Sequence, residues 1–310
     1  MTSSGYAQPG DPRPAGLGEQ HLAHLGVLAV RGPEARKFLH GQLSQDVLGL
    51  RPDRVEWAGW HNPQGRTLAL LRLVPCGPQD VRCVLPRELL ADTLAGLQKY
   101  LLRARATLTD ESALWRVVGL AGDAALPAAP GSARQEAGRI LWRHAADGRV
   151  LAVLPQPPAD APSPEPPHPP HPPHPPAAQA GGDWQAADIA AGLPELTART
   201  RGEFVAQMLN LDALGGISFT KGCYTGQEII ARAHYRGRVK RRAQHFRLPP
   251  GAIPSPGDTV TLADGRDAQV VLAAAARPVD GGDAAIDILA VAPTLAGDPL
   301  ALPLAYPLPE

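Results

Sequence analysis

A run of proline and histidine in the middle of the chain limits where packed structure can form. Residues 166–176 contain only these two residue types, and residues 155–182 are dominated by Pro, His, Ala and Gly. Proline has no backbone donor and is excluded from helix interiors and central strands. In polyproline II, His168, His171 and His174 would lie about 9 Å apart, too far to chelate one metal ion. We expect a stiff, disordered insertion at 155–182, with metal storage or an SH3-type ligand as alternatives.

Short apolar strands alternate with two helices before the insertion. A helix is expected to start at Gly32-Pro33-Glu34, with proline at a permitted first position, and another at Pro86. Residues 55–60 and 66–74 form a hairpin across Asn62–Gly65. The other expected strands are 24–30, 81–85, 113–120, 139–144 and 149–154. Irregular alternation with hairpins predicts an α+β fold of mainly antiparallel sheets.

The pattern changes again after the insertion. A helix runs from Trp184 to Gly192, and short strands follow at 243–248, 259–262, 268–274 and 284–291. Short strands with regular turns predict a C-terminal β-barrel. The domain prediction is a disordered N-terminus over 1–19, a core over 20–242 that contains the insertion, and the barrel over 243–310.

Charge and cysteine usage exclude several protein classes. Thirty basic and thirty acidic residues cancel, so no overall field attracts nucleic acid or membranes. Cys76, Cys83 and Cys223 are too few for a disulfide framework, and we interpret the first two as strand residues. No apolar run is long enough to span a bilayer, and residues 1–20 do not resemble a signal peptide. We therefore expect a cytoplasmic protein.

One stretch, Phe219–Arg232, concentrates chemically useful side chains. Thr225-Gly-Gln-Glu228 fits a capping box and predicts a helix that starts at about Thr225. Cys223 would then lie just before the positive end of that helix and beside Lys221, where a thiol gains nucleophilic character. The alternative is a glycine-rich turn whose cysteine is only a small buried apolar residue.

Basic residues cluster around the same stretch. Residues 221–247 hold eight of them, including Arg232, Arg236 and Arg238, against a single acid, Glu228. The cluster is either a solvated helix end and strand or a binding site for a carboxylate, a phosphate or RNA. His234 would lie roughly 14 Å along the helix from Cys223, too far to act as its base. Motifs of conventional hydrolases, kinases and zinc sites are absent from the sequence.

Aromatic residues and arginines together suit a flat heterocycle with an acidic tail, such as a pterin that carries glutamate. Trp57, Trp60, Trp184 and Tyr224 are the candidates. Each tryptophan could instead belong to the core.

The residues of Ile217–Arg232, continued by Tyr235–Arg241, resemble the signature of the folate-binding YgfZ family, which is related to the glycine-cleavage T-protein, an aminomethyltransferase. Further matches are the segments 30–47, 62–66, 191–194 and 210–216. The resemblance covers roughly residues 20–310 apart from the insertion. It implies a T-protein-like two-lobed core with a C-terminal β-barrel, arranged around a central opening for tetrahydrofolate.

The resemblance also implies a role in the assembly or repair of iron–sulfur clusters, notably in enzymes that methylthiolate tRNA. Cys223 would be the functional thiol and a transient cluster or sulfur ligand. The folate-binding and turn-shaping residues would be Trp184, Lys221, Tyr224, Gln227, Glu228, Arg232 and Arg238. At a second position where relatives in the family offer an aromatic residue, this chain has Leu25.

Two functional hypotheses follow. The first is a monomeric accessory factor, rather than a turnover enzyme, that binds a folate and works with iron–sulfur client proteins and their assembly machinery. Four ligands normally hold a cluster, so a partner or small thiol would have to complete it. The alternative is a folate-dependent aminomethyl or one-carbon transferase. Direct tRNA binding by the basic cluster has no further support in the sequence.

Overall fold

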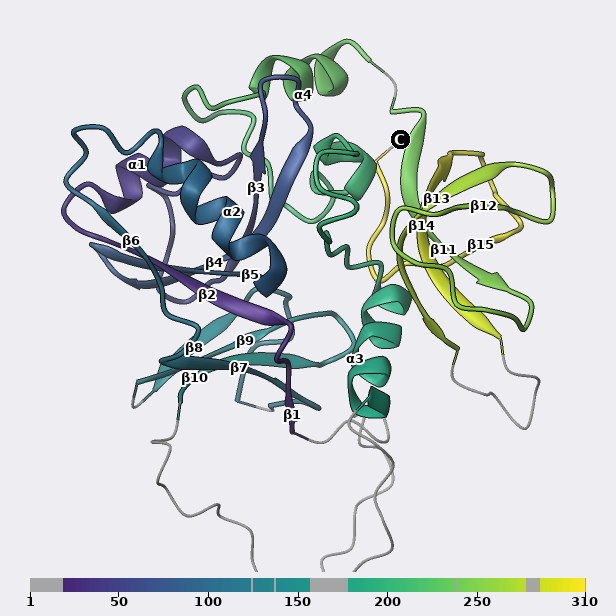
Figure 1. Cartoon of the computed structure of the whole chain (residues 1–310), viewed down its shortest axis with the longest axis horizontal. Helices are drawn as coiled ribbons and strands as arrows, with labels where there is room; N and C mark the ends of the chain where they lie inside the picture. Colours follow the sequence, from purple (N-terminus) through teal and green to yellow (C-terminus); the bar gives the residue numbers. More distant parts are fainter. Residues whose placement is uncertain are drawn as a thin grey trace, which may run out of the picture.

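Three antiparallel five-stranded sheets organise the chain (Figure 1). The computed structural model describes residues 19–123, 125–136, 138–156, 178–237, 239–276 and 285–309. The expectation of a disordered N-terminus and most of the expected insertion therefore lie outside the described residues. Residues 178–182, which we assigned to the insertion, belong to helix α3 (Ala178–Ala191).

Sheet I carries the first two helices. Its strands, in spatial order, are β3 (Glu56–His61), β4 (Thr67–Gly77), β5 (Asp80–Pro86), β2 (Leu25–Arg31) and β6 (Thr107–Asp110). Side chains alternate between the two faces of a strand. Leu71 and Leu73 of β4 therefore pack with α1 (Ala35–Gln42) and α2 (Arg87–Gln98), whereas Val74 faces the opposite way. The helices cover one face only, and the other face is left for a second sheet.

Sheet II packs against that second face. Its order is β1 (Gln20–His21), β7 (Trp115–Leu120), β10 (Val150–Pro155), β9 (Arg139–Arg143) and β8 (Ala133–Glu136). Val74 and Val84 of sheet I share a buried cluster with Trp142 and Val153 of sheet II. Helix, sheet and sheet thus form three successive layers on this side of the molecule.

Sheet III is formed by the C-terminal part of the chain, with α3 packed against β13 and β14. Its order is β12 (Thr259–Thr261), β13 (Asp267–Ala275), β14 (Ile286–Pro293), β11 (Arg241–Leu248) and β15 (Ala301–Leu302). Among the described residues no pairing joins the edge strands β12 and β15. The closed barrel and the boundary between residues 242 and 243 therefore stay predictions.

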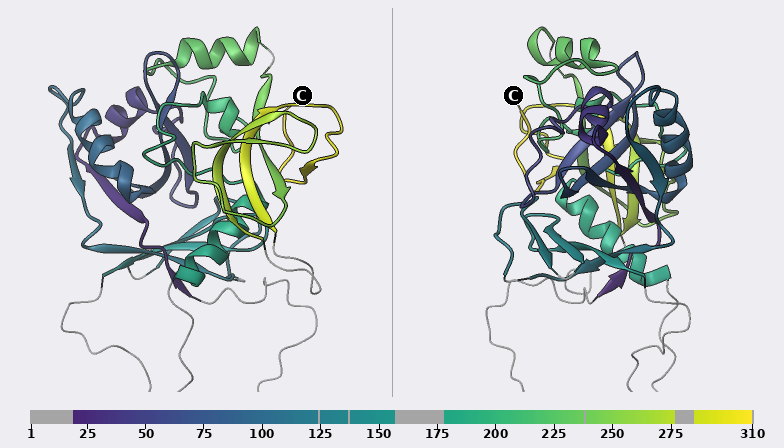
Figure 2. Two further views of the ribbon diagram at one scale, coloured as in Figure 1. Left: turned by 45° about the vertical axis from the view of Figure 1, so that its right-hand side comes forward. Right: turned by 90° about the vertical axis from the view of Figure 1, so that its left-hand side faces the viewer.

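Residues 193–226 cross the middle of the molecule and connect the sheets (Figure 1). They contain the short 3-10 helix η1 (Ala206–Leu209) and lead to α4 (Gln227–Tyr235). Arg242 of β11 forms a buried ion pair with Asp212 of this segment, at 2.8 Å. Helix α4 lies at the outer end of the molecule, far from sheet II, in every view (Figures 1 and 2).

The predicted strands with long apolar runs are confirmed to within a few residues, and Cys76 and Cys83 lie in β4 and β5. Strands β1, β6, β8 and β15 were not predicted, because they have few buried side chains and so little apolar periodicity. Within the described part of the chain, no helix is long and apolar enough to cross a membrane.

Candidate functional site

Lys221 anchors the turn that carries Cys223, residues 218–226, which we call the thiol turn. Its Nζ atom donates hydrogen bonds to the carbonyls of His40 and of Leu43, the latter at 2.7 Å. These carbonyls lie at the C-terminal end of α1, where a cation complements the helix dipole. Burial lowers the pKa of Lys221 to about 8, while Asp46 and Cys223 act in the opposite direction. The amine that we expected beside the thiol thus also holds the turn on the core.

Gln227 organises the other end of the thiol turn, and the predicted capping box is wrong. Helix α4 begins at Gln227, its N-cap is Gly226, and no side chain caps it. Instead, the Gln227 Oε1 atom accepts a hydrogen bond from the backbone N–H of Tyr224, at 3.1 Å. The Gln227 Nε2 atom donates towards Cys223 Sγ, at 3.8 Å. A glycine in the left-handed region replaces the threonine cap, and the amide contacts the thiol.

Close backbone packing explains why glycine occupies position 226. Its φ is +82°, and a Cβ there would lie 2.5 Å from the carbonyl oxygen of Asn62, in the β3–β4 turn. The thiol turn is therefore pressed against that hairpin. Cys223 is exposed, and it lines an open depression with Pro63, Tyr224 and Gln227. An exposed thiol on a fixed backbone can meet a partner without local unfolding.

The basic cluster does not form one common anion site among its described residues. Arg242 pairs with Asp212, Arg247 pairs with Asp287, and Arg241 donates to the carbonyls of Asp267 and Val291. Arg232, Arg236 and Lys240 are exposed, Glu228 is exposed beside the thiol turn, and Arg238 lies outside the described residues. The structure therefore divides the cluster into an internally paired part and an exposed part.

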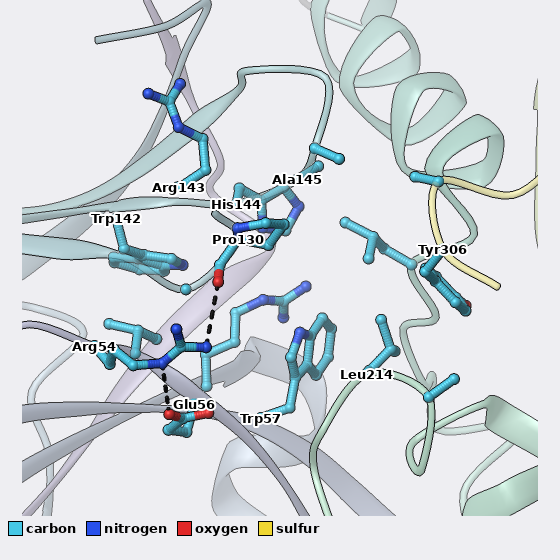
Figure 3. A pocket seen from close by; sticks show the side chains of 17 residues that line it. Arg54, Glu56, Trp57, Pro130, Trp142, Arg143, His144, Ala145, Leu214 and Tyr306 are labelled. Atoms are coloured by element: carbon cyan, nitrogen blue, oxygen red, sulfur yellow. Dashed lines mark hydrogen bonds and ion pairs between the residues drawn. The ribbon is translucent and has the colours of Figure 1, made fainter. Parts of the chain in front are cut away.

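A central pocket lies where sheet I, sheet II and the connecting segment meet (Figure 3). It has a volume of about 720 Å³, including the part open to solvent. Figure 3 shows Arg54, Glu56 and Trp57 on one side, Trp142 and His144 on a second, and Leu214 and Tyr306 on a third. Arg54 donates to Glu56, at 2.8 Å, and to the carbonyl of Pro130, at 3.4 Å.

Two side chains give the pocket wall its chemistry. Trp57 offers an aromatic face, with the Arg72 guanidinium carbon 4.0 Å from its ring centroid. Tyr306, from the C-terminal tail, donates its hydroxyl to the carbonyl of Gly192, at 2.5 Å, and burial raises its pKa to about 12. Aromatic faces beside guanidinium groups suit a flat ligand that carries an acid.

The aromatic residues that we expected to bind a flat ligand lie in different parts of the structure. Trp57 lines the central pocket, whereas Trp60 is buried against Gly96 in the core of sheet I. Trp184 is 2 % exposed and stacks on His144, with a centroid distance of 5.7 Å, so it lies behind the pocket wall. Leu25 belongs to the same core cluster as Trp184. Tyr224 is half-buried in the thiol turn, under Lys221 Nζ at 4.7 Å.

Sequence reasoning missed the pocket residues Arg72, Trp142, His144 and Tyr306. One signal was available, because Arg72 is the only charged residue in the apolar stretch 68–74. Trp142 and His144 come from one end of β9, whereas Tyr306 is far away in the chain, and they meet Arg72 only in the folded structure. Within the described residues there is no cluster of three or more potential metal-binding side chains.

Comparison with known proteins finds relatives at about 30% sequence identity. The tRNA-modifying protein YgfZ of Cronobacter sakazakii is 31% identical over 257 residues, which are 79% of this chain and 76% of that protein. The protein of the same name from Escherichia coli O157:H7 is 30% identical over 256 residues, with the same coverage. An uncharacterized protein of Haemophilus influenzae is 30% identical over 232 residues, 73% of this chain and 72% of that protein. No family model matches the chain.

Among solved structures, the glycine cleavage system aminomethyltransferase T from Bartonella henselae has a similar fold. The TM-score is 0.59, the sequence identity is 14%, and the match covers 92% of this chain and 83% of that structure. At this identity the likeness concerns the fold alone. The described sheets are therefore arranged as in the T-protein, as the sequence motifs implied.

Proposed function

The chain belongs to the family of the tRNA-modifying protein YgfZ, and from this we propose that it is a folate-binding accessory factor for tRNA modification. In the proposal it supports the assembly or repair of iron–sulfur clusters in client enzymes, including those that methylthiolate tRNA. Two parts of the structure support different halves of this proposal, the thiol turn and the central pocket.

The observation that carries the proposal is the exposed thiol of Cys223 on an anchored turn. Lys221 fixes the turn to α1, Gln227 contacts the sulfur, and Gly226 packs on the β3–β4 hairpin. A cluster normally needs four ligands, so one thiol serves only when a client protein or small thiol supplies the others. An exposed position permits such a shared and transient contact.

The central pocket supports the folate half of the proposal. Its wall combines the aromatic residues Trp57 and Tyr306 with arginine side chains, and a mixed aromatic and polar lining is typical of small-molecule sites. These rings would hold the flat pterin and aminobenzoyl parts, and the arginines would meet the acidic tail. Bound tetrahydrofolate would supply one-carbon chemistry, and the protein residues would bind and orient it.

The T-protein fold favours a second candidate, a folate-dependent one-carbon transferase that uses the same pocket. The two candidates differ in what Cys223 does. An accessory factor needs the thiol for its clients, whereas a transferase acts on a folate and an amine in the pocket. Turnover of methylenetetrahydrofolate with a purified amine donor would favour the transferase.

Complementation tests the proposal directly. A strain that lacks the gene is assayed for tRNA methylthiolation and for iron–sulfur enzyme activity, and is complemented with the wild type, Cys223→Ala or Cys76→Ala. Cys76 is the matched control, because it is a half-buried thiol in β4. We expect rescue by the wild type and by the control only. Full rescue by Cys223→Ala would eliminate the proposed role of the thiol.

A further inference from the structure

Arg72 is a buried arginine to which the described residues offer no hydrogen-bonding partner. It is 4% exposed and lines the central pocket, and it makes no hydrogen bond or ion pair with any described residue. Each of the other buried arginines among the described residues has at least one oxygen atom of the protein as an ion-pair or hydrogen-bond partner. Arg149 and Arg242 bind carboxylates, Arg143 donates to backbone carbonyls, and Arg82 lies 3.9 Å from Glu111.

Strand pairing fixes the position of Arg72. In β4 it lies on the face of sheet I that is opposite α1 and α2, between Leu70 and Val74. Its partner across the antiparallel ladder is Trp57 of β3, and its guanidinium stacks over that indole. The ring covers one face of the guanidinium and leaves its N–H edges for a ligand in the plane.

The nearest acidic groups are already engaged. Asp188 and Glu195 are close enough to influence Arg72 electrostatically. However, Asp188 accepts hydrogen bonds from His144, at 3.0 Å, and from Arg149, at 2.5 Å. Glu195 lies 3.6 Å from His24. Among the residues described, these carboxylates therefore support Arg72 only through longer-range electrostatics, and neither forms a hydrogen bond with it.

A buried cation without a partner is costly, and arginine cannot escape the cost by losing its proton. A guanidinium stays charged at neutral pH even where burial lowers its pKa, as it does for Arg72. Such a cost is expected at a binding site, where a bound ligand supplies the missing negative charge. The planar fork of N–H groups matches a carboxylate in a bidentate arrangement.

We propose that Arg72 is the receptor for a carboxylate of the ligand in the central pocket. Given the proposed folate function, on which this identification rests, the group is a carboxylate of the glutamate tail. Arg72 would then set the preference of the pocket for acidic over neutral forms of the same ligand. The residue binds and selects, and it takes no part in any chemical step.

This inference is tested by comparing two ligands on two proteins, the wild type and one variant. Binding of 5-formyltetrahydrofolate and of its glutamate diamide, in which both carboxylates are neutral amides, is measured by calorimetry with the wild type and with Arg72→Met. A buried charge-assisted hydrogen bond corresponds to about ten- to a hundredfold in affinity. We expect the wild type to prefer the diacid by that factor, and Arg72→Met to bind both ligands equally. An equal loss for both ligands in Arg72→Met would overturn the inference.

The stability of the ligand-free protein gives a second readout. If Arg72 had a structural partner, Arg72→Met would melt at a lower temperature. Removal of a buried cation that only stacks on Trp57 should change the melting temperature little, and a decrease as large as that from breaking a buried ion pair would contradict the inference. Circular dichroism confirms that the variant is folded.

A simple dicarboxylate separates the two proposals. If the wild type binds neither folate form, the folate function fails. The Arg72 inference is then decided by glutarate, which should raise the melting temperature of the wild type but not that of Arg72→Met. Equal effects of glutarate on both proteins, or no effect on either, would overturn the carboxylate receptor.

Discussion

Lys221 is separated from Cys223 by a single glycine, and its side chain donates a 2.7 Å hydrogen bond to the backbone carbonyl of Leu43. The same side chain therefore closes the last turn of α1 and positions the thiol turn.

Lys221 should make stability depend on pH. Its pKa is about 8 in the folded protein, below the ordinary lysine value of 10.5. The unfolded state then binds more protons between these values, so the contribution of Lys221 to the free energy of unfolding rises as pH increases from 8 to 10.5. A neutral amine still has two N–H groups for the carbonyls of His40 and Leu43. Urea unfolding at several pH values measures the effect, with Lys221→Met as the control that should lose this slope.

Cys223 should be the only thiol that reacts quickly in the native protein. Burial raises the pKa of Cys76 to about 11 and that of Cys83 to about 12, so both are almost entirely thiols at neutral pH. Titration with a chromogenic disulfide reagent should show one fast equivalent, and two more only after denaturation. The fast phase should vanish in Cys223→Ser, and its survival there would contradict the assignment.

Gly226→Ala should destabilise the thiol turn more than the same change at Gly215. Both glycines have positive φ, which costs alanine about 1 kcal/mol. At Gly226 the new Cβ would also lie 2.5 Å from the Asn62 carbonyl, whereas nothing lies within 4 Å of it at Gly215. Overpacking adds about 2 kcal/mol. Equal free energies of unfolding for the two variants would show that the hairpin contact is not tight.

Arg242 and Arg232 should behave differently although both belong to the basic cluster. Arg242→Met leaves Asp212 buried without a partner and should cost about 3–5 kcal/mol of folding free energy. The double variant Arg242→Met, Asp212→Leu should recover much of that loss. Arg232→Ala on the exposed side of α4 should change the free energy of unfolding by less than about 0.5 kcal/mol.

The Arg232→Ala variant also tests binding of RNA by the exposed part of the basic cluster. If exposed charges such as Arg232 bind a phosphate backbone, affinity for tRNA should fall steeply with salt and weaken in Arg232→Ala. Binding that is unchanged by salt would assign these charges to solubility alone.

The strands and helices were largely predictable because their signals are local. Long apolar runs fixed β2, β4, β5 and β10, and Gly192 and the β3–β4 turn were recognised from glycine and proline. The start of α4 was predicted to within two residues, but its cap was predicted wrongly, because a threonine and a glutamate at capping-box spacing outweighed a glycine that packs against Asn62. That contact is invisible until the hairpin and the turn are brought together.

The sequence by itself determined the family, the antiparallel α+β character and the position of Cys223 in a turn before a helix, because each depends on residues that are near one another in the chain. Only the tertiary structure decided which charges are free. Arg242 and Asp212 are 30 residues apart and Lys221 is 178 residues from Leu43, yet each pair is in contact. Arg72 has no such partner among the described residues, and its local distinction is only that it is the one charged residue in the apolar stretch 68–74. Whether a charge is paired depends on packing between distant segments, and packing is what the fold adds to the sequence.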